Sequence, residues 1–169
     1  MAGAKVMVCG DIGVGKSTAV RAAMTRLGWE KPGGFFTHWD GQGRGADVLC
    51  VETWAGEKRP MARRIAPPAA PSGLAYELDG GFAPFAAAAL AAAPVVLDEL
   101  GLIEWESAEF VAAVAKLFRG PAPVLAVVQR RALDRWLGAM GPKNAALVLR
   151  ADAATRDALP GQIAALFRA

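Results

Sequence analysis

The segment Gly10-Asp-Ile-Gly-Val-Gly-Lys-Ser17 follows directly on the apolar run Val6-Met-Val-Cys9. An apolar run, a glycine-rich loop and a Lys-Ser pair, in that order, are typical of the strand, loop and helix that wrap nucleotide phosphates. Glycine lets such a loop turn tightly, so that its N–H groups face phosphate oxygens, and the following helix N-terminus adds positive potential. The segment therefore predicts a nucleotide-binding α/β domain, with a strand over 5–9 and a helix over 16–27.

The loop also assigns roles to single residues. Lys16 is expected to contact the β- and γ-phosphates as a catalytic residue, and Ser17 to bind magnesium. The other expected phosphate contacts are Gly10, Asp11, Ile12, Gly13, Val14, Gly15 and Thr18. The alternative interpretation is a glycine-rich turn that only precedes a helix.

A second acidic motif ends an apolar run later in the chain. Val95-Val-Leu leads into Asp98 and Glu99. A strand of this kind carries the carboxylate that holds Mg²⁺, because a hard dication prefers oxygen ligands. We therefore expect Asp98 to hold the metal and Glu99 to activate or position water; the alternative is a solvated turn. Asp98-Glu-Leu-Gly also fits a GTP switch, but Pro142-Lys143-Asn144 does not supply the guanine-specificity element of that class.

Polar residues follow the next expected strand, over 123–128. Gln129 and Arg130 are candidate catalytic residues that sense the γ-phosphate, and Arg131 is a further candidate for the same contact, because parallel strands converge at their carboxyl ends. Helix capping or surface exposure is the alternative for all three. Arg156, before the last helix, is a candidate nucleotide contact or else an exposed first-turn residue.

The remaining pattern indicates one domain over 1–169 with a β-rich insertion at about 33–79. Short β-type runs at 35–39, 46–54 and 59–66, divided by glycine and proline turns, predict antiparallel hairpins. Helices are expected from Pro84 to about Ala92 and over 107–118, 131–138 and 157–168, with strands at 95–98, 123–128 and 145–149. This alternation predicts a three-layer P-loop fold with a mainly parallel sheet.

Composition narrows the class of protein. The net charge is only +3 and the basic residues are scattered, so a nucleic-acid partner is not required, although a basic patch in three dimensions is not excluded. Cys9 and Cys50 lie in apolar runs, which favours free thiols and a cytoplasmic protein. The most apolar stretch, 82–97, is too short to span a membrane and holds two prolines, and the N-terminus leaves no room for a signal peptide.

Other candidate functional residues have a simpler structural interpretation. Arginines at 59, 63 and 64 either cover phosphate like a lid or keep a β edge soluble, which we favour. His38 has no partner at zinc-ligand spacing. Trp39 and Trp54 either flank a base or, more commonly, pack in the core.

Taken together, these motifs resemble the THEP-type family of small P-loop nucleoside triphosphatases over nearly the whole chain. The matching segments are Gly10–Thr18, Gly34-Phe-Phe-Thr37, Gly43-Arg-Gly-Ala-Asp-Val48, Val95-Val-Leu-Asp-Glu-Leu-Gly101 with Glu104, Ser107 and Phe110, and Thr155-Arg-Asp157. The chain departs from the family by a Pro/Ala-rich segment before Tyr76, by Ala46 in place of a common Phe, and by Gln129 where a histidine is expected.

The resemblance implies hydrolysis of ATP, GTP and other nucleoside triphosphates with Mg²⁺, and a fold related to nucleotide kinases. Two alternatives stay open from the sequence. One is a kinase that transfers the γ-phosphoryl group to a nucleotide, a small molecule or a nucleic-acid end. The other is a nucleotide-gated regulator that turns over only with a protein partner.

Overall fold

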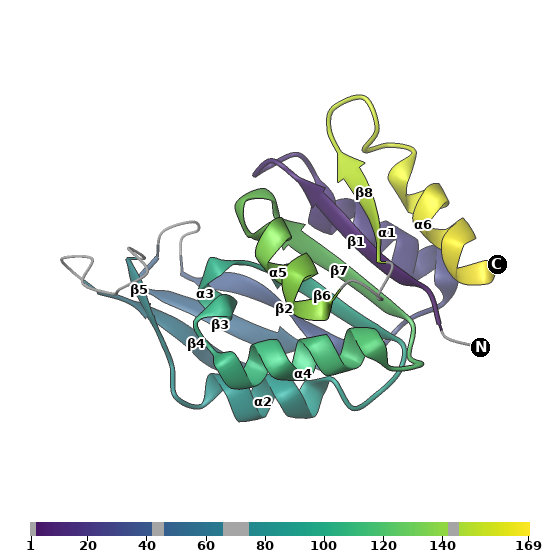
Figure 1. Cartoon of the computed structure of the whole chain (residues 1–169). Coiled ribbons are helices and arrows are strands. Elements are labelled where there is room, and N and C mark those ends of the chain that lie inside the picture. Colours follow the sequence, from purple (N-terminus) through teal and green to yellow (C-terminus); the bar gives the residue numbers. More distant parts are fainter. Residues whose placement is uncertain (1–2, 42–45, 66–74, 142–145) are drawn as a thin grey trace.

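The structure, a computed structural model, describes residues 3–41, 46–65, 75–141 and 146–169. Its strands join in one sheet of order β5-β4-β3-β2-β6-β7-β1-β8 (Figure 1). The strands are β1 (Lys5–Gly10), β2 (Gly33–Asp40), β3 (Val48–Thr53), β4 (Lys58–Arg64), β5 (Tyr76–Leu78), β6 (Val95–Leu100), β7 (Val124–Gln129) and β8 (Leu147–Ala151). The helices are α1 (Lys16–Leu27), α2 (Phe82–Ala89), α3 (Leu102–Trp105), α4 (Ala108–Arg119), α5 (Leu133–Met140) and α6 (Leu159–Arg168), with a 3₁₀ turn η1 (Arg130–Ala132) before α5.

The centre of the sheet is parallel. Strand β1 pairs in parallel with β7 and β8, and β6 pairs in parallel with β7 and β2. Strands β3, β4 and β5 then continue the sheet in antiparallel order. The fold class predicted from the alternation of strands and helices, a mainly parallel α/β sheet with antiparallel strands, is confirmed.

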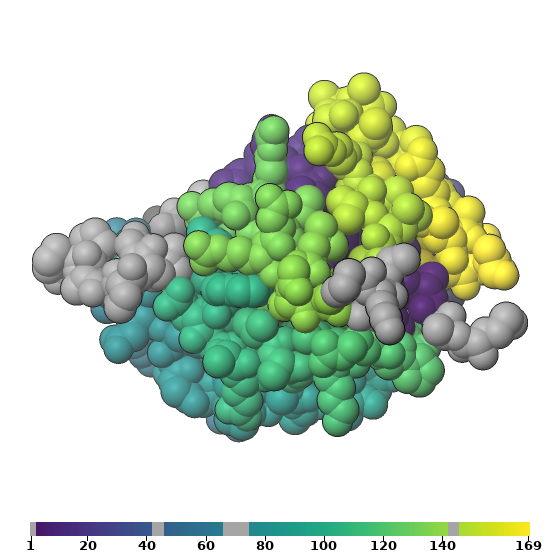
Figure 2. All heavy atoms as spheres, in the orientation of Figure 1, coloured from purple at the N-terminus to yellow at the C-terminus, as the bar shows by residue number. Residues whose placement is uncertain are grey.

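Helices cover both faces of the parallel strands, which explains why these strands read as unbroken apolar runs. Alternate residues of a strand face opposite sides. On β1, Val6 and Val8 pack with α1 and α6, whereas Met7 packs on the other side with Phe110 of α4 and Trp136 of α5. Figure 1 shows α2 and α4 side by side on that second face, and Figure 2 shows α4 and α5 hiding the strands beneath them.

Helix α1 forms where its apolar spacing predicted it. Ala19, Val20, Ala23 and Met24 are buried, at the three-to-four residue spacing that keeps them on one face. The helix ends at Gly28, whose φ of 68° is left-handed, and the N–H groups of Gly28 and Trp29 donate to the carbonyl oxygens of Thr25 and Met24 in the last turn. Both ends of α1 are therefore set by local sequence.

The β-rich region differs from the prediction in one respect. The run 35–39 was expected to belong only to antiparallel hairpins, but β2 pairs antiparallel with β3 on one side and parallel with β6 on the other. Phe36 lies opposite Asp98 in this parallel pairing. The region thus belongs to the same sheet as the parallel strands. The link is the pairing of β2 with β6, which is distant in the sequence and is therefore not visible in the local pattern.

Several element boundaries also differ. Helix α2 begins at Phe82 and ends at Ala89, rather than running from Pro84 to Ala92. Pro84 is tolerated because a first-turn N–H has no helical acceptor. Helix α6 begins two residues later than expected, and β8 extends to Ala151. The short helix α3 was not predicted at all.

Some sequence features lie outside the described residues, namely Gly43-Arg-Gly45 of the resemblance, the turn at Pro67-Pro68, and Pro142-Lys143-Asn144. Among the residues described, no helix combines the length and apolarity needed to cross a membrane.

Two glycine substitutions are expected to change stability in opposite directions. A Cβ on Gly10 would lie 2.3 Å from the Ala151 carbonyl oxygen of β8, whereas a Cβ on Gly138 of α5 would meet nothing. Gly10→Ala should lower the free energy of unfolding by about 1–3 kcal/mol through overpacking. Gly138→Ala should raise it by about 0.5–1 kcal/mol by lowering the entropy of the unfolded chain. Urea unfolding of both variants tests this, and equal effects would contradict the close approach of β1 and β8.

Candidate active site

The loop between β1 and α1 closes around its own lysine. Lys16 Nζ donates to the carbonyl oxygens of Gly10 and Asp11 at 2.8 and 2.7 Å, and Lys16 is only 7% exposed. Gly15 precedes the helix with φ of 100°, a left-handed conformation that favours glycine. No acidic residue lies in the first turn of α1, so the positive end of the helix is uncompensated.

The loop helix is joined to β6 by one hydrogen bond. Ser17 Oγ donates to Asp98 Oδ1 at 2.9 Å. Asp98 is 5% exposed, and burial raises its pKa, while the Ser17 hydrogen bond and the positive charge of Arg21 act in the opposite direction. The two residues predicted to hold a metal are therefore in contact, although 81 positions separate them in the sequence.

Glu99 is held by a different partner from its neighbour. Gln129 Nε2, at the end of β7, donates to Glu99 Oε1 at 2.6 Å, and Gln129 Oε1 accepts from the N–H of Leu102 at 3.4 Å. Gly101 leaves room for this amide, because a Cβ there would lie 2.6 Å from Gln129 Cδ. The adjacent carboxylates of Asp98 and Glu99 thus have different partners. Asp98 bonds to α1, and Glu99 bonds to the end of β7.

Glu104 of α3 is a site residue to which sequence reasoning gave no role. Its side chain is 3% exposed, and its Oε2 accepts from the N–H of Gly101 at 2.9 Å. Burial, reinforced by the negative charge of Glu99, raises its pKa to about 8, although backbone hydrogen bonds act against the shift. The signal that could have found it is a glutamate three residues after Gly101, the spacing of a helix cap.

These residues line one cleft of about 580 Å³. It begins at the loop and crosses the carboxyl ends of β7 and β6 to β2, β3 and α3. Its lining residues are Ile12, Gly13, Gly15, Lys16, Ser17, Thr18, Thr37, His38, Trp39, Leu49, Asp98, Glu99, Ile103, Glu104 and Gln129. Among the predicted residues the cleft thus collects Ile12, Gly13, Gly15, Lys16, Ser17, Thr18, Asp98, Glu99 and Gln129, together with Trp39, one of the two candidates to flank a base. The other β2 residues of its wall, Thr37 and His38, had no predicted binding role.

Other predicted residues do not line this cleft. Arg130 is exposed and pairs with Asp11 of the loop at 2.9 Å, which raises the pKa of Arg130. Arg156 pairs with Asp157 at 3.7 Å, and its Cδ would lie 4.0 Å from a Cβ on Gly15. Arg131 is exposed, and Gly10, Asp11 and Val14 belong to the loop outside the cleft lining. Roles for Arg130 and Arg156 in nucleotide contact stay predictions.

Of the residues with simpler interpretations, the arginines and Trp54 lie outside the cleft lining, whereas His38 and Trp39 belong to it. Arg59 lies over the ring of Phe85 at 5.6 Å, Arg64 lies near Tyr76, and neither lines the cleft. Arg63 of β4 is exposed and is also absent from the lining. Trp54 packs on Phe36 at 4.9 Å and donates to the Val96 carbonyl oxygen, whereas Trp39 lines the cleft.

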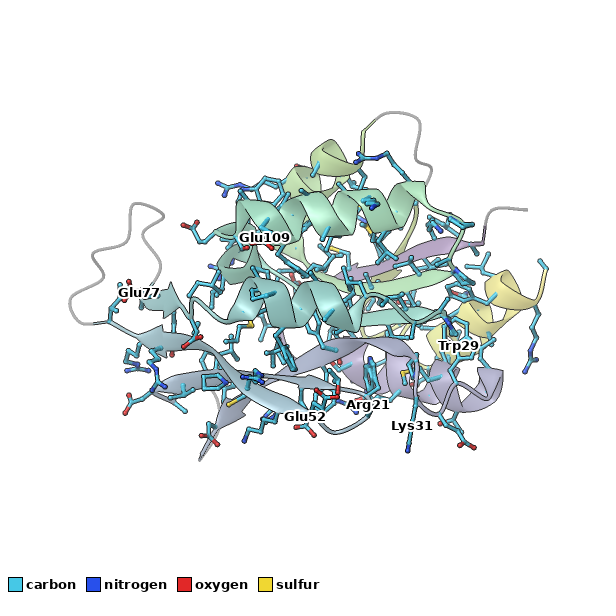
Figure 3. The ribbon with its side chains drawn as sticks, turned by 90° about the horizontal axis from the view of Figure 1, so that it is seen from below. Arg21, Trp29, Lys31, Glu52, Glu77 and Glu109 are labelled. Carbon is cyan, nitrogen blue, oxygen red and sulfur yellow. The ribbon has the colours of Figure 1, made fainter. Side chains whose placement is uncertain are left out.

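Charged side chains also gather on the face of the sheet opposite α4. Arg21 lies 4.7 Å from the ring centre of Phe36 and 5.0 Å from that of Trp54. Figure 3 shows Arg21 of α1 and Glu52 of β3 on this face and Glu109 of α4 on the other. Glu52 bonds His38 at 2.9 Å, so the single histidine is tied to a carboxylate of the neighbouring strand.

Sequence comparisons agree with the geometry. The model of a family described as NTPase matches residues 5–164. The chain belongs to this family. The nucleoside-triphosphatase THEP1 of Methanosarcina barkeri (strain Fusaro) is 30% identical over an alignment of 171 residues, gaps included, and the alignment covers 97% of each protein. The resemblance to THEP-type enzymes drawn from the motifs is thereby confirmed.

Two solved structures have a similar fold. The crystal structure of THEP1 from the hyperthermophile Aquifex aeolicus matches with a TM-score of 0.77, at 20% identity, over 98% of this chain and 99% of that one. The solution structure of a human cancer-related nucleoside triphosphatase matches with a TM-score of 0.72, at 23% identity, over 96% of both chains. At these identities the matches speak for the fold alone.

The buried acid Glu104 should make stability depend on pH. Its folded pKa of about 8 exceeds the unfolded value near 4.5. Between pH 5 and 8 the unfolded state therefore binds fewer protons at this site, and wild-type stability should fall by about 1 kcal/mol per pH unit relative to Glu104→Gln. The glutamine keeps an acceptor for Gly101 and does not titrate.

Urea unfolding of both proteins at pH 5, 6, 7 and 8 measures this difference. Other titrating groups are present in both proteins and cancel in the comparison. A gap between wild type and Glu104→Gln that stays constant over this range would contradict the buried, neutral state of Glu104.

Proposed function

We propose that this protein is a Mg²⁺-dependent nucleoside triphosphatase that hydrolyses ATP, GTP and other nucleoside triphosphates to diphosphates and phosphate. Membership of the NTPase family makes nucleoside triphosphates the substrate class. The single observation that carries the proposal is the 2.9 Å contact of Ser17 with Asp98, which joins a phosphate-binding loop to a buried carboxylate. A phosphate loop alone would account for binding but not for hydrolysis.

The loop supplies the phosphate contacts. Lys16 Nζ already lies between two loop carbonyls, so an incoming phosphate exchanges these acceptors for its own oxygens with little movement of the lysine. The N-terminus of α1 and the loop amides add positive potential toward the same position. These groups bind and orient the triphosphate tail.

The residues present fit a magnesium ion. Ser17 Oγ and Asp98 Oδ1 are two hard oxygen donors in contact, and Mg²⁺ is commonly held by one or two protein ligands together with substrate phosphates. Within the described part of the chain, no group of three or more His, Cys, Asp or Glu side chains forms a metal site of its own. When bound, the ion neutralises negative charge on the β- and γ-phosphates.

Glu99 is the residue that activates water. It lines the cleft one position beyond Asp98, and the Gln129 amide fixes one of its oxygens. The second oxygen can accept a proton from water as that water attacks the γ-phosphorus. Gln129 thus acts as a positioning residue for the base, and the direct γ-phosphate contact expected from its place at the end of β7 stays a prediction.

We further propose that the protein works in the cytoplasm. Cys9 and Cys50 are both buried free thiols, which suits a reducing compartment.

Loss of the base should slow the chemical step without loss of binding. Glu99→Gln removes the proton acceptor while keeping the shape, so kcat for phosphate release from ATP and GTP should fall by about 10²- to 10⁴-fold. Nucleotide affinity should stay near that of wild type. The matched control is Glu106→Gln, an exposed glutamate at the end of α3. A Glu99→Gln protein that hydrolyses as fast as wild type means that another group is the base.

Loss of the buried carboxylate should weaken the response to magnesium. The asparagine of Asp98→Asn can still accept a hydrogen bond from Ser17 but carries no charge. The Mg²⁺ concentration that gives half-maximal activity should therefore rise by about tenfold or more. Phosphate release across a magnesium titration measures this, with Asp134→Asn on the exposed first turn of α5 as control. An unchanged magnesium requirement in Asp98→Asn would remove Asp98 from the metal site.

A further inference from the structure

The cleft is longer than hydrolysis requires. Strands β6 and β2 are parallel with Phe36 opposite Asp98, so Trp39 lies three residues further toward the carboxyl end of β2. At a rise of about 3.3 Å per residue, Trp39 is roughly 10 Å along the strand beyond Asp98. An attacking water needs only about 3 Å, the length of a hydrogen bond.

The part of the cleft beyond Asp98 has walls that are mainly aromatic and apolar. Leu49 of β3 lies opposite Trp39 in the antiparallel pairing, and the ring of Trp39 packs on Tyr76 at 5.2 Å, which makes one wall aromatic and fixed. We call this end of the cleft the outer chamber. Its lining residues are Thr37, His38, Trp39, Leu49, Ile103 and Glu104.

The charged residues that line the cleft limit which molecules the outer chamber can bind. Among the described residues that line the cleft, the sole lysine or arginine is Lys16, which serves the loop. Of the glutamates that line the cleft, Glu104 belongs to the outer chamber and Glu99 does not, and Glu52 holds His38. The described lining of the outer chamber thus offers no lysine or arginine to balance a phosphate or carboxylate group. Its one acid, Glu104, is buried and has a raised pKa, so an uncharged aromatic molecule suits these walls.

We propose that the outer chamber binds an uncharged aromatic alcohol and that the γ-phosphoryl group is transferred to its hydroxyl in competition with water. This inference rests on the proposed triphosphatase function, because it uses the same phosphate loop and the same base. It adds a second substrate class to a site otherwise described by hydrolysis alone.

The transfer balances in atoms and charge. The bond between the γ-phosphorus and the β,γ-bridging oxygen breaks and leaves the nucleoside diphosphate with that oxygen. A new bond forms between the γ-phosphorus and the alcohol oxygen. The hydroxyl proton passes to Glu99 and from there to solvent, as it does from water in hydrolysis. Glu104, which lies buried at the boundary of the chamber, can donate a hydrogen bond to the alcohol when it is protonated.

The test measures where labelled phosphate goes. The full chain is incubated with Mg²⁺ and ATP labelled at the γ-phosphate, together with benzyl alcohol or thymidine as the aromatic alcohol. Equal concentrations of 4-(hydroxymethyl)benzoate, which adds one negative charge, and of methanol, which lacks the ring, serve as matched controls. Labelled benzyl phosphate or thymidine phosphate should exceed the products of either control by about tenfold or more.

Variants locate the transfer in the outer chamber. Trp39→Ala should lower the ratio of phosphorylated alcohol to inorganic phosphate by about tenfold, and this ratio is independent of how much protein is folded. Trp29→Ala is the matched control: Trp29 packs on Phe167 and lies at the opposite end of the molecule from Glu77, the neighbour of Tyr76 (Figure 3). The Trp29→Ala ratio should equal that of wild type.

The outcomes separate the two proposals. Phosphate release to water with no labelled alcohol product overturns the acceptor chamber and leaves the triphosphatase in place. An equal product ratio in wild type and Trp39→Ala also overturns it. Absence of any ATP consumption would overturn the triphosphatase itself, and the chamber inference with it.

Discussion

The parallel pairing of β1, β7, β6 and β2 is the constraint on which the site depends. The carboxyl ends of parallel strands lie at the same edge of a sheet. This edge therefore carries the loop after β1, the amide of Gln129 and the carboxylates of β6. Such strands require apolar cover on both faces. The α1 and α6 layer and the α2, α4 and α5 layer provide it, and each layer packs on alternate residues of the same strands.

Much of the site was predictable because its signals are local. The loop, the start and end of α1, and the carboxylates after Leu97 are each encoded within a few residues. The structure brings together Ser17 and Asp98, which their motifs had marked as the two expected magnesium ligands. The fold class and the family followed from the order of these same motifs.

What the sequence did not reveal depends on partners far along the chain. The parallel neighbour of β2 lies some sixty residues downstream, so its hairpin-like pattern described only one of its two edges. The burial of Glu104 depends on packing around a helix of four residues, which is too short to leave a periodic pattern. Gln129 was placed near the γ-phosphate on strand order alone, whereas its hydrogen bond to Glu99 depends on side-chain geometry that strand order does not specify.

The antiparallel side of the sheet ends on β5, which has three residues. An open sheet edge exposes unpaired amides and carbonyls that can template a strand from another molecule. Strand β5 pairs only with Ala62–Arg64 of β4, so an incoming chain would gain few ladder bonds from β5 itself. The rest of this edge, Lys58–Pro60 of β4, carries two exposed cations and a proline without an N–H, which disfavour the addition of a strand from another molecule.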